Sequence, residues 1–289
     1  MSPQFTFKNS WLKMPMMLDQ PRSDILPANK EELPQLIISP ADTGDVRTLV
    51  DIEFHAFENE RANQQLSYRD YTKPEHFERA VQAYMMILAA ADHVQYLDKE
   101  SKANQALTKT PETRTHQVSL RKVTNTKKEQ ILSFAKAEIK AYTSSELDSA
   151  ADVGHENDPQ MNRDWFALNE SMRRQYMGLI KHCYIGMLAT LPCHQHKGAG
   201  TMLLNDICND ADEAGLEVYL EATDMAKPLY LKHGFVAVNG IRFDPARYGC
   251  FDIGKERQTI MVRGAVDGNG KRKCVRPWDE AVAETEGAR

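Results

Sequence analysis

Residues 182–215 constrain the fold of this chain more than any other segment. An almost unbroken apolar run over 182–191 is typical of a buried strand. The segment Gln195-His196-Lys197-Gly198-Ala199-Gly200 follows, and it leads into an amphipathic helix that Gly215 ends. The first N–H groups of a helix lack internal partners and carry partial positive charge, so they attract anions. Because its two glycines allow close backbone approach, the segment predicts a phosphate-binding loop.

Other kinds of site fit this loop less well. A dinucleotide fingerprint needs a third glycine where Leu203 stands, and a P-loop needs Gly-Lys-Ser/Thr. Glu221 lies near the spacing of the acidic residue of a Rossmann fold, but only one βαβ-like unit is present. Cys193-His194-Gln195-His196 contains good metal ligands, but they are too tightly spaced to converge on one ion, so no metal site is predicted.

The rest of the chain alternates between predicted strands and helices. Strands are expected at 36–38, 118–123, 131–139, 182–191, 218–220, 235–238 and 259–262, the second and third forming a hairpin. Helices are expected at 46–57, 76–98, 164–179, 203–214 and 225–233. Polar stretches at 99–115 and 240–257 are expected to be loops.

These elements suggest one domain with additions at both ends. Residues 1–35 are predicted to be an extended lead-in, and 36–263 the folded domain. Within it, 143–179 supplies a polar insertion and a helix before the fourth strand. Residues 264–289, polar and glycine-containing, are predicted to be a loose tail.

Composition excludes several function classes. The chain has 289 residues, 42% hydrophobic and 27% charged, with a net charge of −5, which suits a globular domain without a nucleic-acid-binding field. No apolar run approaches the ~20 residues of a membrane span, and no secretory signal begins the chain. Five cysteines without a C-x-x-C pair indicate reduced thiols. A cytoplasmic location is expected, with the nucleus left open.

Two motifs then make the chain resemble the GNAT (Gcn5-related) N-acetyltransferase family. Its coenzyme A motif, Arg/Gln-x-x-Gly-x-Gly/Ala, is matched by Gln195, Gly198 and Gly200, after a strand ending Leu188-Ala189-Thr190-Leu191-Pro192. Downstream, a second motif is matched by Ala226, Leu229, Tyr230, Gly234 and Phe235. The resemblance is strong over 182–238 and looser over 36–263. Within it, the amino-acid sequence looks most like that of fungal members.

The resemblance implies a fold and a co-substrate. The fold is α/β (α+β), with a mixed, mostly antiparallel sheet that is flanked by helices and splays between the fourth and fifth strands. Acetyl-CoA would enter this split. The residues implied to bind it are Leu188, Ala189, Thr190, Gln195, His196, Lys197, Gly198, Ala199, Gly200, Thr201, Thr223 and Tyr230. Thr223 stands where many members carry Asn, and Thr190 where Val is usual.

The resemblance also implies catalytic roles. Tyr230 matches a position that often protonates the coenzyme A thiolate, although it would also suit packing on the pantetheine. Histone-type members carry a Glu that acts as the general base at the position where this chain has Tyr184. Glu221 is the leading substitute, a structural carboxylate being the alternative. The weaker candidates for the base are Glu53, Glu58, His182 and a water chain.

The function expected is N-acetyltransfer, by direct transfer in a ternary complex, to the amine of a small molecule. An acetyl-CoA-binding sensor is the alternative, and a protein lysine acetyltransferase is less favoured. Trp165, Phe166, Arg173 and Arg174 either line the acceptor pocket or, the preferred interpretation, belong to a helix with solvated arginines. A homodimer is left open, and no nucleic-acid or membrane partner is expected.

Overall fold

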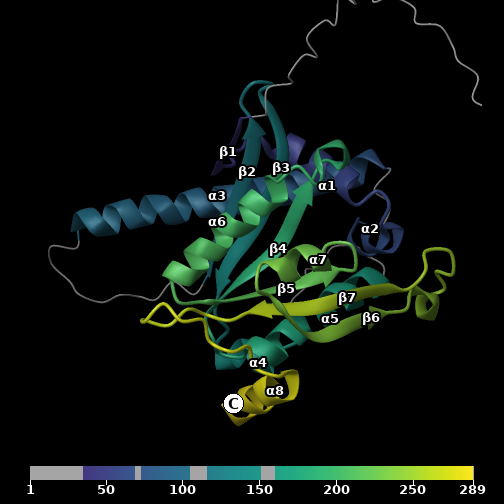
Figure 1. The fold of residues 1–289 in the computed structure, drawn as a ribbon. Helices are drawn as coiled ribbons and strands as arrows, with labels where there is room; N and C mark the ends of the chain where they lie inside the picture. Colours follow the sequence, from purple (N-terminus) through teal and green to yellow (C-terminus); the bar gives the residue numbers. More distant parts are fainter. Residues whose placement is uncertain (1–34, 69–72, 105–115, 151–159, 289) are drawn as a thin grey trace, which may run out of the picture. The chain divides into compact units, whose positions relative to one another are not determined.

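A computed structural model describes residues 35–68, 73–104, 116–150 and 160–288, and these contain one seven-stranded sheet (Figure 1). Its strands are β1 (Leu36–Pro40), β2 (His116–Asn125), β3 (Gln130–Lys140), β4 (His182–Thr190), β5 (Glu217–Thr223), β6 (Val236–Phe243) and β7 (Glu256–Arg263). They lie in the order β1-β2-β3-β4-β5-β7-β6, and every neighbouring pair is antiparallel except β4 and β5. The predicted mixed, mostly antiparallel sheet is confirmed.

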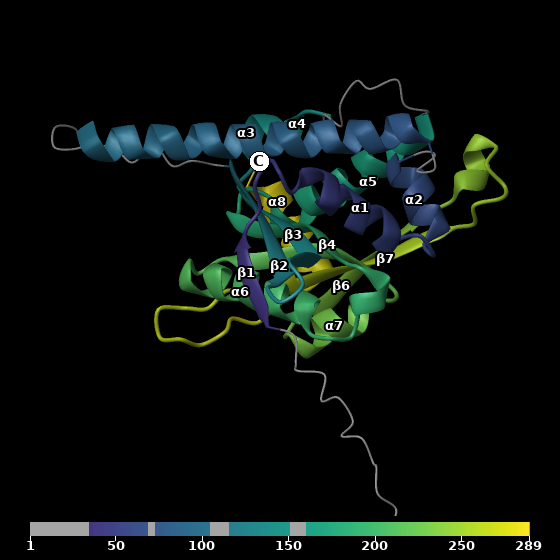
Figure 2. The same ribbon diagram turned by 90° about the horizontal axis from the view of Figure 1, so that it is seen from above.

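Helices cover both faces of the sheet, with α6 and α7 on one side and α1 and α3 on the other (Figure 2). The helices are α1 (Val46–Ala56), α2 (Arg61–Tyr68), α3 (Pro74–Asn104), α4 (Ser144–Asp148), α5 (Gln160–Met177), α6 (Ala199–Glu213), α7 (Lys227–Lys232) and α8 (Trp278–Gly287). Two short 3₁₀ helices, η1 (Pro192–His194) and η2 (Pro245–Tyr248), lie in the connections.

Alternation along the strands assigns side chains to these two faces. Val218 and Leu220 of β5 pack with Leu203 and Ile207 of α6. The intervening Tyr219 belongs to a different core, which includes residues of α5, α8, β6 and β7. A third core joins α1 and α3 to β2, β3 and β4. One strand therefore presents neighbouring residues to opposite sides of the sheet.

The structure extends or corrects several expected boundaries. Residues 99–104 continue α3 rather than forming a loop, because this polar stretch contains no glycine or proline. β6 and β7 pair as far as Phe243 and Glu256, so the expected loop at 240–257 is shorter and contains η2. The expectations for 1–34 and 105–115 lie outside the described residues.

The C-terminal segment is ordered, so the expectation of a loose tail is wrong. Trp278 of α8 stacks on Tyr176 of α5 with ring centroids 5.5 Å apart, and Ala281 is completely buried. Arg276 binds Glu217 of β5 at 3.1 Å. Arg272 also pairs with Asp212 of α6 at 2.8 Å. One helix face and two ion pairs therefore join this polar segment to the domain, which its average composition does not reveal. The division of the chain into domains stays a prediction.

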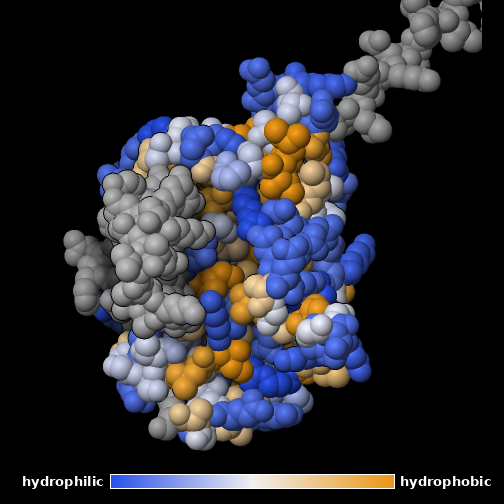
Figure 3. Space-filling model, turned by 90° about the vertical axis from the view of Figure 1, so that its left-hand side faces the viewer, coloured by the Kyte–Doolittle hydropathy of each residue, from blue (hydrophilic) through white to orange (hydrophobic). Residues whose placement is uncertain are grey.

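The outer surface mixes polar and apolar residues. Hydrophilic side chains cover much of the face in Figure 3, with hydrophobic ones in smaller groups among them. Within the described parts of the chain, no helix combines the length and apolar character that crossing a membrane requires.

Candidate functional site

The sheet opens between β4 and β5. These strands pair only through His182↔Glu217, Cys183↔Val218 and Tyr184↔Tyr219. Among the described residues no pair follows Tyr184, so the remainder of β4 and the end of β5 face one another across an opening. The predicted splay between the fourth and fifth strands is therefore present, and backbone groups along its edges lack the ladder partner that they would have in a continuous sheet.

A bulge in β4 lies next to this opening. On β3, Lys136 pairs with Met187 and Ala137 with Ile185, which leaves Gly186 as an extra residue. A Cβ atom at Gly186 would come within 3.1 Å of the Tyr184 ring. The sequence analysis missed this bulge, although a glycine inside an apolar strand is its usual signal.

The predicted phosphate loop connects the end of β4 to α6. His196 has a φ of 59° and Gly198 a φ of 94°, so left-handed residues flank Lys197. Gly198 is the N-cap of α6 and provides no side-chain hydrogen bond, which leaves first-turn N–H groups available to a ligand. A Cβ atom at Gly198 would meet nothing within 4 Å, so the space beside it is open. The loop is thus shaped as an anion-binding backbone.

Gly200 has a different role from Gly198. A Cβ atom at Gly200 would lie 3.3 Å from Thr190 Oγ1, so this glycine lets α6 approach the end of β4. Thr190 Oγ1 is 2.7 Å from Ser133 Oγ, which also donates to the Ala189 carbonyl at 2.7 Å. The hydroxyl that replaces the expected Val is therefore paired. Gln195 Nε2 donates to the Thr190 carbonyl at 3.3 Å and ties the loop to β4.

Positive charge gathers at the loop. Lys197 Nζ donates to the Cys193 carbonyl at 2.7 Å. Burial lowers the pKa of His194, and the charges of Lys197 and Lys128 lower it further. Lys128 comes from the β2–β3 turn and Lys197 from the loop before α6, so two segments supply positive charge that would attract a pyrophosphate.

Tyr230 and Glu221 lie on opposite sides of β5. Tyr230 of α7 belongs to the α6-side core, is 6% exposed and packs edge-on against Phe235 with centroids 5.6 Å apart. Burial, and secondarily Cys208, raise the pKa of Tyr230 well above its ordinary value, so the phenol stays protonated at neutral pH. Glu221 alternates with Leu220 and Ala222, which face α6, and therefore points to the other side.

Glu221 is two residues beyond Tyr219, which forms the last β4–β5 pair, and is the first residue on that face of β5 past the closed part of the sheet. Burial raises the pKa of its carboxyl, whereas the charge of Arg173 and the hydroxyl of Tyr184 oppose that rise. Within the described residues, Glu221 Oε1 is buried without a hydrogen-bond partner, and so is the Tyr219 hydroxyl. A half-buried carboxylate with one shielded oxygen that has no hydrogen-bond partner among the described residues suits proton transfer or a polar ligand.

Acidic residues from other segments lie near the end of β5, and the sequence analysis missed them. Thr223 Oγ1 donates to Glu60 Oε1 at 3.2 Å and accepts from the Ala226 N–H at 3.4 Å. Burial raises the pKa of Glu256 to about 7, with Glu60 and Asp224 adding to the rise. The hydroxyl predicted to bind cofactor thus already contacts a carboxylate. Glu60 could not be recognised from spacing because it lies 163 residues from its partner.

The weaker candidates for the base differ in their surroundings. Glu58 is exposed. His182 is completely buried, its Nδ1 is 2.8 Å from the Ile180 carbonyl, and burial lowers its pKa to about 4. Glu53 of α1 is 2% exposed and accepts a 2.7 Å hydrogen bond from the Tyr84 hydroxyl; burial raises its pKa to about 7. Only Glu53 among these three combines burial with a pKa near neutrality.

The preferred interpretation of α5, a helix with two solvated arginines, is wrong for both Arg173 and Arg174. Arg173 is 7% exposed, and its guanidinium carbon lies 3.7 Å from the Tyr184 ring centroid. Arg174 is half-buried rather than solvated, since it pairs with Glu170 at 3.0 Å. Trp165 is buried against Phe243, whereas Phe166 is 41% exposed. The helix periodicity identified the apolar stripe but could not show that a charged residue beside it is covered.

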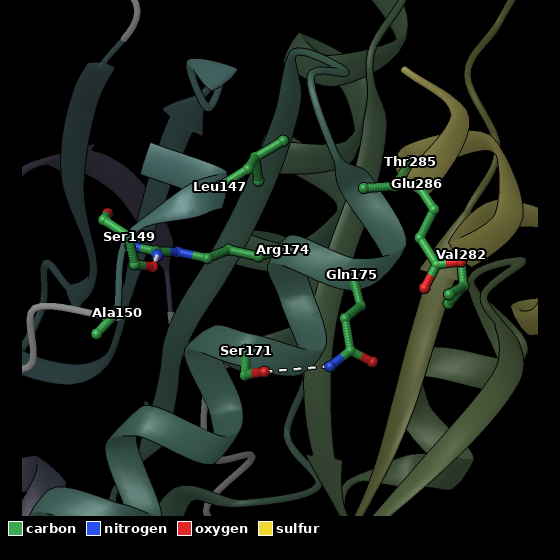
Figure 4. Close-up of a pocket in the computed structure, with 9 residues that line it drawn as sticks. All are labelled: Leu147, Ser149, Ala150, Ser171, Arg174, Gln175, Val282, Thr285 and Glu286. Atoms are coloured by element: carbon green, nitrogen blue, oxygen red, sulfur yellow. Dashed lines mark hydrogen bonds between the residues drawn. The ribbon is translucent and has the colours of Figure 1, made fainter. Parts of the chain in front are cut away.

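Two pockets have no lining residue from β4 or β5. One, of about 450 Å³, lies between α4, α5 and α8, and Figure 4 shows Arg174 extending toward Ser149 at its edge. The other, of about 790 Å³, is lined by residues of α5, β6, η2 and β7, including Glu256. Across the described residues, no group of three or more His, Cys, Asp or Glu side chains is arranged to hold a metal, and Cys193 is exposed.

Comparison with known proteins connects this geometry to one family. Residues 155–245, which include β4, the loop, α6, β5 and α7, match the model of the acetyltransferase (GNAT) domain. No curated protein matches the chain. Solved structures with a similar fold include mosquito arylalkylamine N-acetyltransferase like 5b, at 11% identity and a TM-score of 0.51 over 79% of this chain and 99% of that one.

Another similar structure is the polyamine N-acetyltransferase of Drosophila melanogaster, at 11% identity and a TM-score of 0.50 over 79% of this chain and 98% of that one. The C-terminal condensation domain of Ebony, in complex with beta-alanyl-dopamine, has 12% identity and a TM-score of 0.50 over 80% and 99%. At such identities these likenesses show the fold alone.

Proposed function

We propose that this chain, which contains a GNAT acetyltransferase domain, transfers the acetyl group of acetyl-CoA directly to the amine of a small molecule. The observation that carries the proposal is the union of two features. The sheet opens after three β4–β5 pairs, and the opening adjoins an uncapped helix whose N-cap glycine faces open space. A long ligand with a phosphate group at one end fits that combination.

The chain's own groups suit acetyl-CoA at both ends. The N–H groups between Gln195 and Thr201 would bind the pyrophosphate, assisted by the side chains of Lys197 and His196. The unpaired edge of β4 at Leu188, Ala189 and Thr190 would hydrogen-bond the pantetheine. Thr223 would bind at the far side only by sharing its hydroxyl with Glu60.

Transfer requires two proton movements on opposite sides of the thioester. The amine nitrogen bonds to the carbonyl carbon, the carbon–sulfur bond breaks, the amine loses a proton and the thiolate gains one. Glu221 would accept the amine proton, and Tyr230 would give its phenolic proton to the sulfur and recover one from solvent. Their places on opposite sides of β5 match this division.

Glu53 is a second candidate for the base, because its pKa of about 7 is close to that of an efficient general base. The two are separated by Glu221→Gln and Glu53→Gln variants. Loss of kcat in the first variant alone supports Glu221, and loss in the second alone supports Glu53.

The first experiment measures acetyl-CoA binding by calorimetry in three proteins: the parent chain, Gly198→Glu and Gly270→Glu. Both substitutions place a glutamate at a positive φ, 94° and 77°, where a Cβ atom meets nothing within 4 Å. Both therefore carry similar backbone strain, but only Gly198 adjoins the proposed phosphate site. We expect micromolar binding in the parent and in Gly270→Glu, and none in Gly198→Glu.

Equal binding by both variants would place the phosphates elsewhere, and no binding by a folded parent would refute the proposal. If the parent binds, primary amines are screened for acetylation, starting with an arylalkylamine and a polyamine, the kinds named for two fold neighbours. Binding without turnover on any amine, or on lysine peptides, would favour the sensor alternative. Fungal origin and a cytoplasmic location stay predictions.

A further inference from the structure

A buried cation lies on the α5 side of the sheet, the side to which the proposed base, Glu221, also points. Arg173 comes from α5, and its guanidinium stacks on the ring of Tyr184 at 3.7 Å. Its Nε donates to the Tyr142 hydroxyl at 2.8 Å, and its Nη2 pairs with Glu170. Stacking and two hydrogen-bonding partners fix the guanidinium in one position, so its charge is preorganised.

The guanidinium of Arg173 lies where the β4–β5 pairing ends. Tyr184 forms the last β4–β5 pair with Tyr219, and Glu221 follows Tyr219 by two residues on the same face of β5. The charged and titratable groups that act on Glu221 are Arg173 from α5, Tyr184 from β4 and Tyr219 from β5. Glu138 of β3 lies opposite Tyr184 and pairs with Lys136 at 2.8 Å.

Among the charged groups of the described residues, Arg173 has the largest effect on the pKa of Glu221, and it lowers that pKa. The two phenols are neutral, since burial raises the pKa of both far above their ordinary value. Glu221 is half-buried, and its Oε1 is shielded from solvent and unbonded among the described residues, so its carboxyl would take up a proton more readily without a nearby cation. A protonated carboxyl cannot accept a proton from an amine.

We propose that Arg173 is a positioning residue for Glu221, keeping its carboxylate ionised beside the opening by a charge held on the face of Tyr184. The inference rests on the proposed function, in which Glu221 is the base. It gives a distinct role to Tyr184, which stands where histone-type members have Glu, because the ring seats the cation instead of supplying the carboxylate.

The test uses three substitutions in α5. Arg173→Met removes the charge and keeps an apolar stem, and Glu170 retains Lys140 at 3.4 Å and Arg174 at 3.0 Å. Arg173→Lys keeps a charge without the planar stacking group. Arg174→Met is the matched control, because Arg174 also pairs with Glu170 but reaches the carbonyls of Glu146 and Ser149 rather than Tyr184.

The first readout does not depend on activity. Each chain is compared with its Glu221→Gln counterpart by urea unfolding between pH 4 and 9, and the difference in unfolding free energy follows the ionisation of Glu221 in the folded state. We expect Arg173→Met to move the midpoint of that difference upward by about one pH unit or more. Arg173→Lys should move it less, and Arg174→Met should leave it in place.

An unchanged midpoint in Arg173→Met, or an equal change in Arg174→Met, would overturn the proposal. Should Arg173→Met not fold, the Arg173→Lys and Arg174→Met pair decides by the same criterion. The second readout is the pH profile of kcat/KM with a test amine that the parent acetylates. Its acidic limb should move to higher pH in Arg173→Met while the Kd of acetyl-CoA stays constant. If no amine is acetylated, the proposed function fails, and the unfolding series still tests Arg173.

Discussion

At the scale of single residues, Tyr230 combines a packing role with a hydroxyl whose use is open to test. Its ring contacts Phe235, and burial keeps the phenol protonated. Tyr230→Phe preserves the ring contact, so we expect little change in stability or in acetyl-CoA affinity. If the hydroxyl is the acid, kcat should fall about 10²-fold or more in steady-state assays.

The control for this substitution is Tyr248→Phe, which removes a hydroxyl that donates to Asp164 of α5 at 2.6 Å and lies outside the core that contains Tyr230. An unaltered kcat in Tyr230→Phe would assign the residue to packing alone.

The pair formed by Ser133 and Thr190 predicts a coupled effect on stability. Ser133→Ala leaves the Thr190 hydroxyl and the Ala189 carbonyl without their shared partner, which should lower the free energy of unfolding by about 1–3 kcal/mol. Thr190→Val alone should cost less, and adding it to Ser133→Ala should recover part of the loss, because an unpaired hydroxyl is then removed. Urea unfolding of the two single variants and the double variant measures this coupling; strictly additive effects would contradict it.

At the scale of elements, the sequence correctly predicted the features that depend on residues close together in the chain. The period of α6, the apolar run of β4 and the glycines between them depend on neighbours within a few residues, and all three were placed correctly. The bulge at Gly186 depends on register with β3, and the burial of Arg173 depends on β4, so neither follows from its own segment. Glu60 joined the site only through the fold.

Helix α8 supplies an element-scale prediction, because its charged sequence conceals one buried face. Ala281 is completely buried and Ala283, two residues later, is exposed. Ala281→Asp places a carboxylate in the core shared with α5 and should lower the free energy of unfolding by more than about 2 kcal/mol. Ala283→Asp should change it by less than about 0.5 kcal/mol. Similar urea midpoints for the two variants would mean that α8 does not pack on the domain in solution.

At the scale of the whole folded domain, some carboxyl groups have lowered pKa values and others have raised ones. Together they predict an intermediate pH at which the folded state is most stable. Burial alone would raise the pKa of Asp212, but ion pairs with Arg272 and Arg263 outweigh it and lower the pKa to about 2. Lys140, Arg173 and Arg174 likewise hold the pKa of Glu170 at about 2 against burial. Burial raises the pKa of Glu53 and Glu256 to about 7.

The signs follow from which state binds more protons. For Asp212 and Glu170 the unfolded chain binds more, so their stabilisation is present above about pH 4–5 and is lost as pH falls toward 2. For Glu53 and Glu256 the folded chain binds more, so their contribution is greatest below about pH 4.5 and is lost as pH rises through 7. We expect urea unfolding between pH 3 and 8 to give a stability maximum near pH 5. Asp212→Asn should flatten the acid side and Glu53→Gln the alkaline side. Since the Tyr84 hydroxyl can still donate to the amide oxygen, a variant of Glu53 that left the alkaline slope unchanged would show that this carboxyl is not protonated in the folded domain.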